Sequence, residues 1–406
     1  MTSYRLAYAD WSAAEYGAAA ACLLRGQIAR GPKPAQLAAQ LAARFAPSTV
    51  YPVNYGHTAL RMALDLFKAR APGRNAVLVP AYICPSVVQT VQAAGLRVVA
   101  VDVGPDLNLT PAAVATALGP DTLAVVAPHM FACPCDIGAI ETLCRDAGVF
   151  LVDDAAQVVG ETVGGRLLGT FGDVGLISFA QSKAVVTGVR GSGGVLLVNR
   201  PELDADARLA WDALPAPRGR LRALAYFVWN YLWHGVTGKS GYYFSRIGEK
   251  LGIAPQVSDT PARISNIEAA IALVQLRRLS ALRADKIRVA DLYQAALRHA
   301  SLSGVDFPQY APGRYLSRIM LSLPPGADLP ALRAALARAG LETRLGYTQP
   351  VDTQQPHAHA ADLARRLFGV PFRAGMQANE ISTICSILST AMAQAPAAPH
   401  IGSIKT

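Results

Sequence analysis

The residues best suited to chemistry are concentrated in the segment 149–198. An apolar run ends in Asp154, Gln157 follows it, and Ser178 and Lys183 precede a glycine cluster. A pyridine-aldehyde cofactor needs an amine for a Schiff base, an anion at its ring nitrogen, a partner for its ring oxygen and donors for its phosphate. Lys183, Asp154, Gln157 and Ser178 are candidates for these roles, in that order.

The proposed anion has a clear physical purpose. A carboxylate beside the ring nitrogen keeps that nitrogen protonated, and the protonated ring can absorb the electron pair released when a Cα–H bond breaks. Taken singly, Asp154 could instead be a helix N-cap, and Lys183 a solvated surface charge. The spacing of the whole set favours the cofactor interpretation.

Further motifs extend this pattern through most of the chain. They are residues 56–60, 79–82, 101–103, 128–131, 154–157, 172–173, 178–179 with Lys183, 193–194, and 269–271 leading to 275–276. In order and spacing, these motifs resemble the DegT/DnrJ/StrS-type sugar aminotransferases, a family of fold-type-I pyridoxal phosphate enzymes. The resemblance implies an α/β fold: a fold-type-I large domain with a central, mostly parallel sheet, and a smaller C-terminal α+β domain.

The resemblance also implies a role for each matching residue. Lys183 matches the Schiff-base lysine, which shuttles the proton between Cα and the cofactor. Some relatives carry histidine at this position and are dehydratases, so Lys183 favours amino transfer. Asp154 matches the partner of the pyridinium nitrogen, and Gln157 matches the contact to the ring oxygen. His129 matches a position near the cofactor whose role stays open.

The phosphate would be held where a helix begins. The resemblance assigns it to Ser178, the backbone amides of His57 and Thr58, and the Thr58 hydroxyl. Gly56 allows a tight turn there, and the first amides of a helix point unpaired N–H groups at an anion. His57 stands where many family members have threonine.

Two further departures from the family pattern concern neighbours of the cofactor. Cys84 occupies the place of an aromatic residue that stacks on the pyridine ring, which leaves Tyr82 or His129 as substitutes. Pro261 replaces an asparagine that reaches the partner subunit's phosphate, although Arg263 matches the arginine of that motif. Tyr82, Cys84, His129 and Arg263 are therefore candidate cofactor or substrate contacts.

The resemblance implies transfer of an amino group from an amino acid, such as glutamate, to a keto-sugar that we expect to be nucleotide-linked. The setting would be cell-surface polysaccharide or secondary-metabolite sugar biosynthesis, in a homodimer whose active sites are shared between subunits. Two alternatives stay open. One is a pyridoxal phosphate enzyme acting on a non-sugar or lipid-linked ketone, and the other is a non-catalytic cofactor-binding regulator.

Composition sets independent limits on these hypotheses. A chain of 406 residues with 52% hydrophobic content can bury a large core in more than one domain. The net charge of +10 is scattered, without a nucleic-acid-binding motif, and suits an anionic small molecule. The six cysteines lack metal-site spacing, so we expect reduced thiols and no metal. Because no signal peptide or membrane-spanning run is found, we expect a cytoplasmic protein.

The expected organisation is a large domain over residues 1–250 and a linking helix with a small domain over residues 251–406. Helical periodicity predicts helices over 13–45, 58–68 and 137–147. Strands are expected over 76–79, 98–101, 123–127, 150–152 and 195–198. Asp154 would then lie at a strand C-terminus, where open α/β sheets bind ligands. Shorter strands and helices are expected from about residue 304.

Two segments allow more than one interpretation. The aromatic-rich insertion at about 215–250, densest over 221–244, is typical of a dimer interface or a core helix, of membrane-surface contact, or of a substrate lid. The glycines at 188 and 193–194 fit either a plain turn or a close approach of the backbone to the cofactor.

Overall fold

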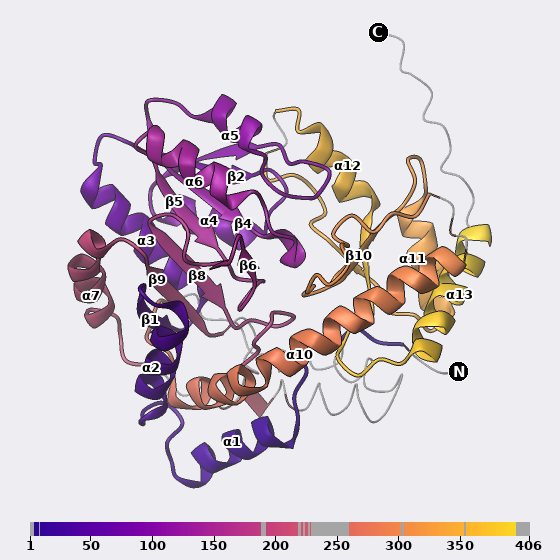
Figure 1. The fold of residues 1–406 in the computed structure, drawn as a ribbon, viewed down its shortest axis with the longest axis horizontal. Helices are drawn as coiled ribbons and strands as arrows, with labels where there is room; N and C mark the ends of the chain where they lie inside the picture. Colours follow the sequence, from indigo (N-terminus) through magenta and orange to yellow (C-terminus); the bar gives the residue numbers. More distant parts are fainter. Residues whose placement is uncertain are drawn as a thin grey trace.

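The computed structural model describes residues 4–394, apart from residues 8, 188–191, 218–220, 222–223, 226–227, 229–259, 301, 303 and 353–354. Its centre is a seven-stranded sheet with the strand order β1-β9-β8-β5-β4-β2-β3 (Figure 1). The strands are β1 (Thr49–Val53), β2 (Ala76–Pro80), β3 (Arg97–Val101), β4 (Thr122–Pro128), β5 (Phe150–Asp154), β8 (Val174–Ser178) and β9 (Gly194–Val198). Strand β9 runs antiparallel to both of its neighbours, β1 and β8, and the other strand pairs are parallel. This confirms the expected, mostly parallel sheet.

Both faces of this sheet are covered, and the strands show why. Val77 and Val79 of β2 belong to one apolar cluster, whereas Leu78 between them belongs to another. Because successive side chains of a strand point to opposite faces, an all-apolar strand contributes side chains to the cores on both faces of the sheet. One core packs against α3 (Gly56–Arg70), α4 (Pro85–Ala93) and α7 (Asp204–Asp212), and the other against α2 (Lys33–Phe45), α5 (Pro111–Ala117) and α6 (Ile137–Asp146).

A second, three-stranded antiparallel sheet is formed by the C-terminal part of the chain. Its strand order is β10 (Ile319–Ser322), β12 (Leu367–Val370), β11 (Arg344–Leu345). Around it lie α11 (Leu329–Arg338), α12 (Ala358–Arg366) and α13 (Ala378–Gln394). The 34-residue helix α10 (Asn266–His299) runs from the large sheet to this second unit (Figure 1). The expected second α+β unit after residue 304 is thereby found.

The N-terminal helical segment differs from the prediction. One helical stretch was expected over 13–45, but the structure has α1 (Ala13–Leu24) and α2, separated by a linker. Ser12 and Glu15 form a capping box at the start of α1, and the linker contains Gly26, Gly31 and Pro32. Glycine and proline disfavour helix interiors, so the periodic alanine pattern on either side does not continue through them.

Two short strands were not predicted. β1 contains Pro52, which a sheet tolerates at its edge, and β8 contains Gly175, which weakens a strand pattern. A small hairpin of β6 (Thr162–Val163) and β7 (Arg166–Leu167) precedes β8. Most of the aromatic segment 221–244 lies outside the described residues, and a domain division near residue 250 stays a prediction.

Among the described residues, no helix is both long enough and apolar enough to cross a membrane.

Candidate active site

The candidate site lies at the carboxyl ends of two adjacent parallel strands. Asp154 is the last residue of β5, Ser178 is the last residue of β8, and Lys183 follows in the loop after β8. Asp154 is in register with Leu176 of β8, two residues before Ser178. The parallel sheet thus brings together side chains that are 24 and 29 positions apart in the sequence.

Lys183 has the electrostatics of a lysine poised for proton transfer. Burial, reinforced by the charge of Arg318, lowers the pKa of Lys183 to about 8, against the opposing effect of Asp154. The preceding residue, Ser182, has a φ of 63°, which is unusual outside glycine. Strain of this kind persists where surrounding contacts hold the backbone, and Arg344 supplies one through its Nη1, which donates to Ser182 Oγ at 3.1 Å.

Asp154 is a buried carboxylate that lacks a full set of partners. Its side chain is buried, and its Oδ1 accepts a 3.0 Å hydrogen bond from the Ala156 amide. Burial raises the pKa of Asp154, and Lys183 opposes the shift. Within the described part of the chain, no cation lies at ion-pairing distance from this carboxylate. A buried anion needs a cationic partner, and a protonated ring nitrogen would be one.

The phosphate end of the site is formed by the start of α3. This helix begins at Gly56 without a side-chain cap from Tyr55, so the amides of its first turn lack acceptors within the helix. A Cβ on Gly56 would lie 3.1 Å from Ser178 Cβ and 3.4 Å from Ser178 Oγ. The serine hydroxyl and the helix amides therefore border the same small space, which suits a phosphate.

Two predicted phosphate contacts are engaged elsewhere. The Thr58 hydroxyl donates to Asn54 Oδ1 at 2.8 Å, and because it has one proton, it cannot also donate to a phosphate in this arrangement. The His57 ring stacks on Tyr55, with centroids 4.5 Å apart and an interplanar angle of 16°. At these two positions, the backbone amides are the groups that fit the predicted role.

The glycines after Lys183 allow a close approach of two backbones. A Cβ on Gly194 would lie 2.6 Å from the amide nitrogen of Gly56, and Gly193 has a φ of 82°. The close approach seen here is to the backbone of α3, and an approach to the cofactor stays a prediction. The pair turns the chain into β9, and it lets β9 pass directly against the first residue of α3.

Gln157 connects the site to the C-terminal unit. Its side-chain oxygen Oε1 accepts a 3.2 Å hydrogen bond from the hydroxyl of Ser317, just before β10. The Ser317 amide in turn donates to the Phe131 carbonyl at 3.4 Å. Gln157 Nε2 is the end of this side chain that could donate to a ring oxygen.

An aromatic wall lies beside these groups. Tyr82 is fully buried, its hydroxyl oxygen accepts a 3.0 Å hydrogen bond from the Tyr347 amide, and the two rings meet edge-on at 5.0 Å. Tyr347 also stacks on Phe131 at 6.0 Å, and the Arg318 guanidinium lies 5.8 Å from the Phe131 ring centre. Phe131 has a φ of 52°, a second left-handed residue at the site.

Cys84 lies beside this wall at the start of α4. Its Sγ is 3.1 Å from the Ser86 hydroxyl, and it is one of the groups that act electrostatically on Lys183. A thiol cannot provide the flat ring that the family pattern has here. Which residue stacks on the pyridine ring stays a prediction.

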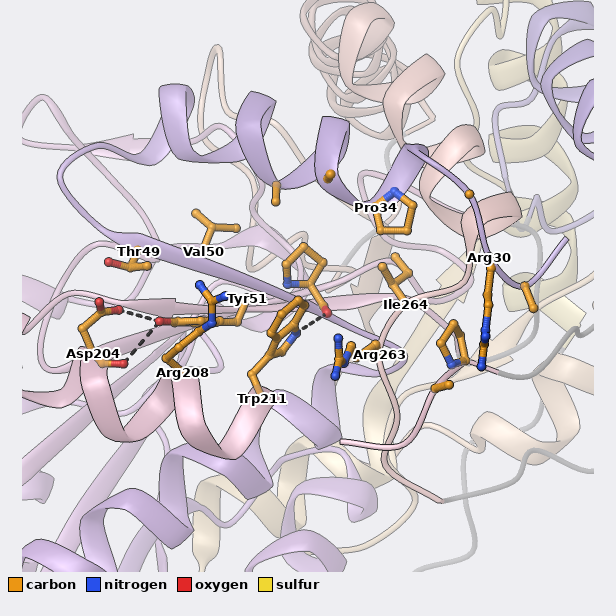
Figure 2. Close-up of a pocket in the computed structure, with 17 residues that line it drawn as sticks. Arg30, Pro34, Thr49, Val50, Tyr51, Asp204, Arg208, Trp211, Arg263 and Ile264 are labelled. Carbon is orange, nitrogen blue, oxygen red and sulfur yellow. Dashed lines mark hydrogen bonds between the residues drawn. The ribbon is translucent and has the colours of Figure 1, made fainter. Parts of the chain in front are cut away.

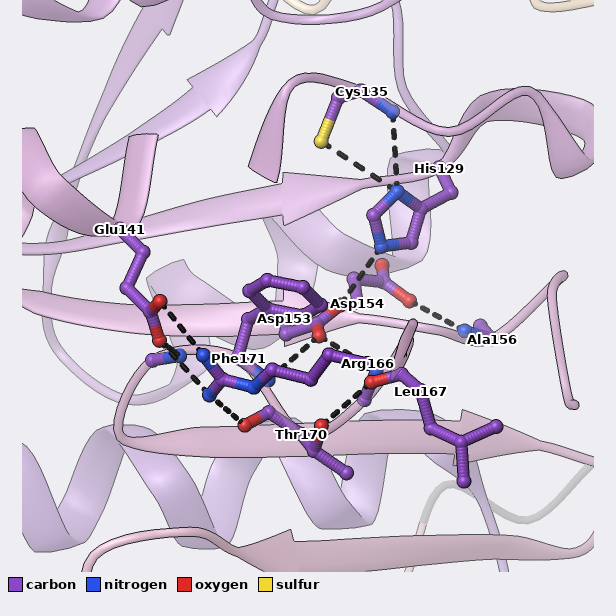
Figure 3. A network of polar contacts seen from close by, with 12 residues as sticks. His129, Cys135, Glu141, Asp153, Asp154, Ala156, Arg166, Leu167, Thr170 and Phe171 are labelled. Atoms are coloured by element: carbon purple, nitrogen blue, oxygen red, sulfur yellow. Dashed lines mark hydrogen bonds and ion pairs between the residues drawn. The ribbon is translucent and has the colours of Figure 1, made fainter. Parts of the chain in front are cut away.

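His129 is a completely buried member of a polar network (Figure 3). Its Nε2 lies 2.8 Å from Asp153 Oδ1, and its Nδ1 accepts a 3.2 Å hydrogen bond from the Cys135 amide. Both ring nitrogens are therefore occupied by protein groups. These contacts fix the orientation of the His129 ring next to β5, and stacking of its face on a cofactor stays a prediction.

Arg263 borders a cleft whose lining does not include Lys183, Asp154 or Ser178. The cleft, of about 780 Å³, lies between α2, β1 and α7 and is also lined by Arg30, Tyr51, Arg208 and Trp211 (Figure 2). Arg263 Nη2 donates to the Asp212 carbonyl at 2.8 Å, and its guanidinium lies 4.7 Å from the Trp211 ring centre. A contact of Arg263 with a cofactor or substrate stays a prediction.

Sequence reasoning missed three residues of the site: Phe131 as a wall, Arg318 and Tyr347. Phe131 was noted only as part of a motif, whereas Arg318 and Tyr347 belong to the C-terminal unit and carry no local motif. Their role depends on how that unit packs against the large sheet. An arginine directly before a short apolar run was the one available signal.

The described donor set fits pyridoxal phosphate. The site supplies a group for each requirement of the cofactor. These groups are a lysine with a lowered pKa, a buried carboxylate without a cationic partner among the described residues, a glutamine amide, and a helix start beside a serine. The described residues contain no cluster of three His, Cys, Asp or Glu side chains that could hold a metal ion.

Comparison with known proteins agrees with this geometry. The model of the DegT/DnrJ/EryC1/StrS aminotransferase family matches residues 10–389. The chain is 28% identical over 373 residues to dTDP-4-dehydro-2,3,6-trideoxy-D-glucose 4-aminotransferase of Saccharopolyspora spinosa, covering 88% of each chain. It is 25% identical over 352 residues to GDP-perosamine synthase of Vibrio cholerae, covering 83% of this chain and 84% of the relative.

Solved structures show the same fold. The aminotransferase PseC of Helicobacter pylori, involved in pseudaminic acid biosynthesis, superimposes with a TM-score of 0.78 at 14% identity, over 97% of this chain and 100% of that one. The aminotransferase TlmJ of Streptoalloteichus hindustanus gives a TM-score of 0.75 at 24% identity, over 96% and 99% of the two chains. These similarities concern the fold, and they agree with the fold-type-I architecture expected from the sequence.

Proposed function

The chain belongs to the DegT/DnrJ/EryC1/StrS aminotransferase family, and from this premise we propose that it transfers an amino group to a nucleotide-linked keto-sugar with pyridoxal phosphate as cofactor. The observation that carries the proposal is the pairing of Lys183 and Asp154 at neighbouring strand ends. Binding alone would not require both a base and an anion for the ring nitrogen. The pair therefore supports an enzyme over a non-catalytic binder.

Each residue of the site has a definite task in such a reaction. When bound, pyridoxal phosphate supplies an aldehyde that captures the substrate nitrogen and a ring that accepts electrons. Lys183 holds and moves the proton at the substrate Cα, which its lowered pKa favours near neutral pH. Asp154 keeps its negative charge opposite the ring nitrogen, while the start of α3 and Ser178 bind the phosphate.

The acceptor class is inferred from the relatives. The two relatives named above act, by their names, in making amino sugars attached to nucleotides. A nucleotide-linked sugar carries a diphosphate, which suits a chain with a net charge of +10. The amino donor would be an amino acid such as glutamate, and the pathway would be polysaccharide or secondary-metabolite sugar biosynthesis.

We further propose that the enzyme is a cytoplasmic homodimer with shared active sites. The family resemblance of the Arg263 motif supports the sharing, and Arg263 borders a cleft whose lining does not include Lys183. Measuring the molar mass in solution by light scattering would test the dimer. A monomer with full activity would contradict a shared site.

The experiment that tests the reaction is a visible absorption spectrum of the purified protein with pyridoxal phosphate, before and after glutamate. We expect a band of lysine-bound aldehyde that glutamate converts into the amine form of the cofactor. A panel of nucleotide-linked keto-sugars should then restore the first band. The Lys183→Ala variant is the control, and full turnover by that variant would contradict the assignment.

A further inference from the structure

The C-terminal unit places an arginine next to the reactive lysine. Ser317 is fixed on two sides, by its hydroxyl to Gln157 and by its amide to the Phe131 carbonyl. Arg318 follows directly, and its guanidinium lies 5.8 Å from the centre of the Phe131 ring. The arginine is therefore held at the site by its neighbours on the chain as well as by its own contact.

The electrostatics agree with this placement. Among the charges that act on Lys183, Arg318 has the largest effect, and it lowers the lysine pKa. Arg318 also opposes the rise in the pKa of Tyr82 and of Tyr347 that burial causes. One guanidinium thus acts on the base and on two members of the aromatic wall.

A second arginine from the same small sheet has a different task. Arg344 lies on β11, and its Nη1 donates to Ser182 Oγ, one residue before Lys183. Its Cγ and Cδ also lie close to Gly369 of the neighbouring strand β12, where a Cβ would be 2.8 Å from Arg344 Cγ. Arg344 is therefore a positioning residue for the lysine loop, whereas Arg318 lies over the aromatic wall.

We propose that Arg318 binds an oxyanion of the substrate while the reacting carbon lies at Lys183. The proposal rests on the proposed function, because it concerns the substrate of the same site. Guanidinium keeps its charge at all relevant pH values and binds carboxylate or phosphate through paired N–H donors. A guanidinium that lies over an aromatic ring, as Arg318 does 5.8 Å from the Phe131 ring centre, makes that contact without its N–H donors, which suit a two-pronged contact with an oxyanion.

The oxyanion can belong to either of two substrates. An amino-acid donor carries carboxylates, and a nucleotide-linked acceptor carries a diphosphate. The two substrates occupy the site in turn, so one arginine can serve both. The proposal predicts that Arg318 discriminates anionic substrates from neutral ones of the same size.

Binding can be tested without turnover. Calorimetry on the cofactor-loaded protein would use glutarate, which has the carboxylates of glutamate but no amine, and inorganic pyrophosphate as probes. We expect Arg318→Gln to weaken binding of at least one probe by about 10- to 100-fold, as loss of a hydrogen-bonded charge contact does. Arg318→Lys, which keeps the charge but not the fork, should weaken it less. Arg365→Gln removes a guanidinium that is 72% exposed on α12 and should leave binding unchanged.

Half-reactions then separate the two sources. If Arg318→Gln needs a higher glutamate concentration for a half-maximal rate in the absence of acceptor, the contact belongs to the donor carboxylate. If it needs a higher acceptor concentration in the second half-reaction, the contact belongs to the diphosphate. Equal behaviour of Arg318→Gln and the unmodified protein in both half-reactions and with both probes would overturn the proposal, as would binding of neither probe to the unmodified protein. If the unmodified protein binds glutarate through Arg318 but transfers no amino group, the proposed function fails and this inference stands.

Discussion

His129 and Asp153 form a completely buried pair in which the imidazole Nε2 lies 2.8 Å from the carboxylate Oδ1. Because the Cys135 amide donates to Nδ1, the ring proton is on Nε2 and is donated to Asp153. The other oxygen of Asp153 accepts from the amides of Gly169 and Phe171 at 2.6 and 3.1 Å. Asp153 therefore ties three segments together at the strand that ends in Asp154 (Figure 3).

Replacing Asp153 with asparagine should destabilise the protein although the volume hardly changes. The amide nitrogen would face either the His129 Nε2 proton or the two backbone amides, so donors would meet donors. Leaving a buried polar group unsatisfied costs about 1–3 kcal/mol, and we expect the free energy of unfolding to fall by that amount. Urea denaturation would measure it. Asp146→Asn, at an exposed side chain, is the matched control and should change stability by less than about 0.5 kcal/mol.

Gly56→Ala should weaken cofactor binding and leave the fold intact. The new methyl group would lie 3.1 Å from Ser178 Cβ, so the serine must shift away from the start of α3. Loss of one hydrogen bond to a charged phosphate corresponds to an affinity about 10- to 100-fold lower. Titration of the apoprotein with pyridoxal phosphate would measure this. Gly138→Ala, with open space around its Cβ, should bind the cofactor normally, and equal affinities would argue against the phosphate site.

The rate at which the apoprotein captures pyridoxal phosphate should rise with pH through about 8. Capture requires the neutral amine of Lys183, and burial together with Arg318 lowers the pKa of this lysine to about 8. The amine is charged below that pH and neutral above it, so the rate should increase about tenfold between pH 7 and pH 9. An unshifted lysine would give a rise of about a hundredfold. In Arg318→Gln, the midpoint should move to higher pH, because a charge that lowers the pKa is removed.

Asp10→Ala should destabilise the junction between α10 and the rest of the chain. Lys286 Nζ lies 2.8 Å from Asp10 Oδ2, and the two side chains are only 7% and 15% exposed. Removing one partner leaves a buried charge, which costs about 3–5 kcal/mol in the free energy of unfolding. Adding Lys286→Met should recover much of the loss. The exposed pair of Arg61 and Asp65 provides the control, since Asp65→Ala should cost at most about 1 kcal/mol.

The parts of the fold that could be predicted from the sequence are those with a strong local pattern. Strands such as β2 and β4 are apolar runs, and the apolar run of β5 ends in the aspartate that marks the site. Asp154 was placed at a strand end, where open α/β sheets bind ligands, whereas Ser178 and Lys183 were found from their spacing and from the family resemblance. Strand β8 was not predicted, because Gly175 interrupts its apolar pattern. Only glycine fits at this position, since a Cβ there would lie 1.9 Å from the Gly169 carbonyl oxygen.

The rest of the site depends on tertiary contacts that local patterns do not encode. Arg318 and Tyr347 reach Phe131 and Tyr82 only because the C-terminal unit packs against the large sheet. The Thr58 hydroxyl was expected to donate to a phosphate, but Asn54 Oδ1 accepts its proton instead. Competition between a neighbouring acceptor and an absent ligand cannot be judged from residue types alone.

Helix α10 has a consequence for how the molecule can come apart. Its first half contributes Ala272 and Leu276 to the core of the large sheet, and its second half contributes Val289 and Tyr293 to the core around the small sheet. A helix of this length is about 50 Å long, so a single helix connects the large sheet with the C-terminal unit (Figure 1). Cutting the chain within it would strip an apolar stripe from each fragment. We therefore expect the two fragments to aggregate and not to fold as independent domains. Unfolding of one core would also destabilise the other, because both cores include residues of α10.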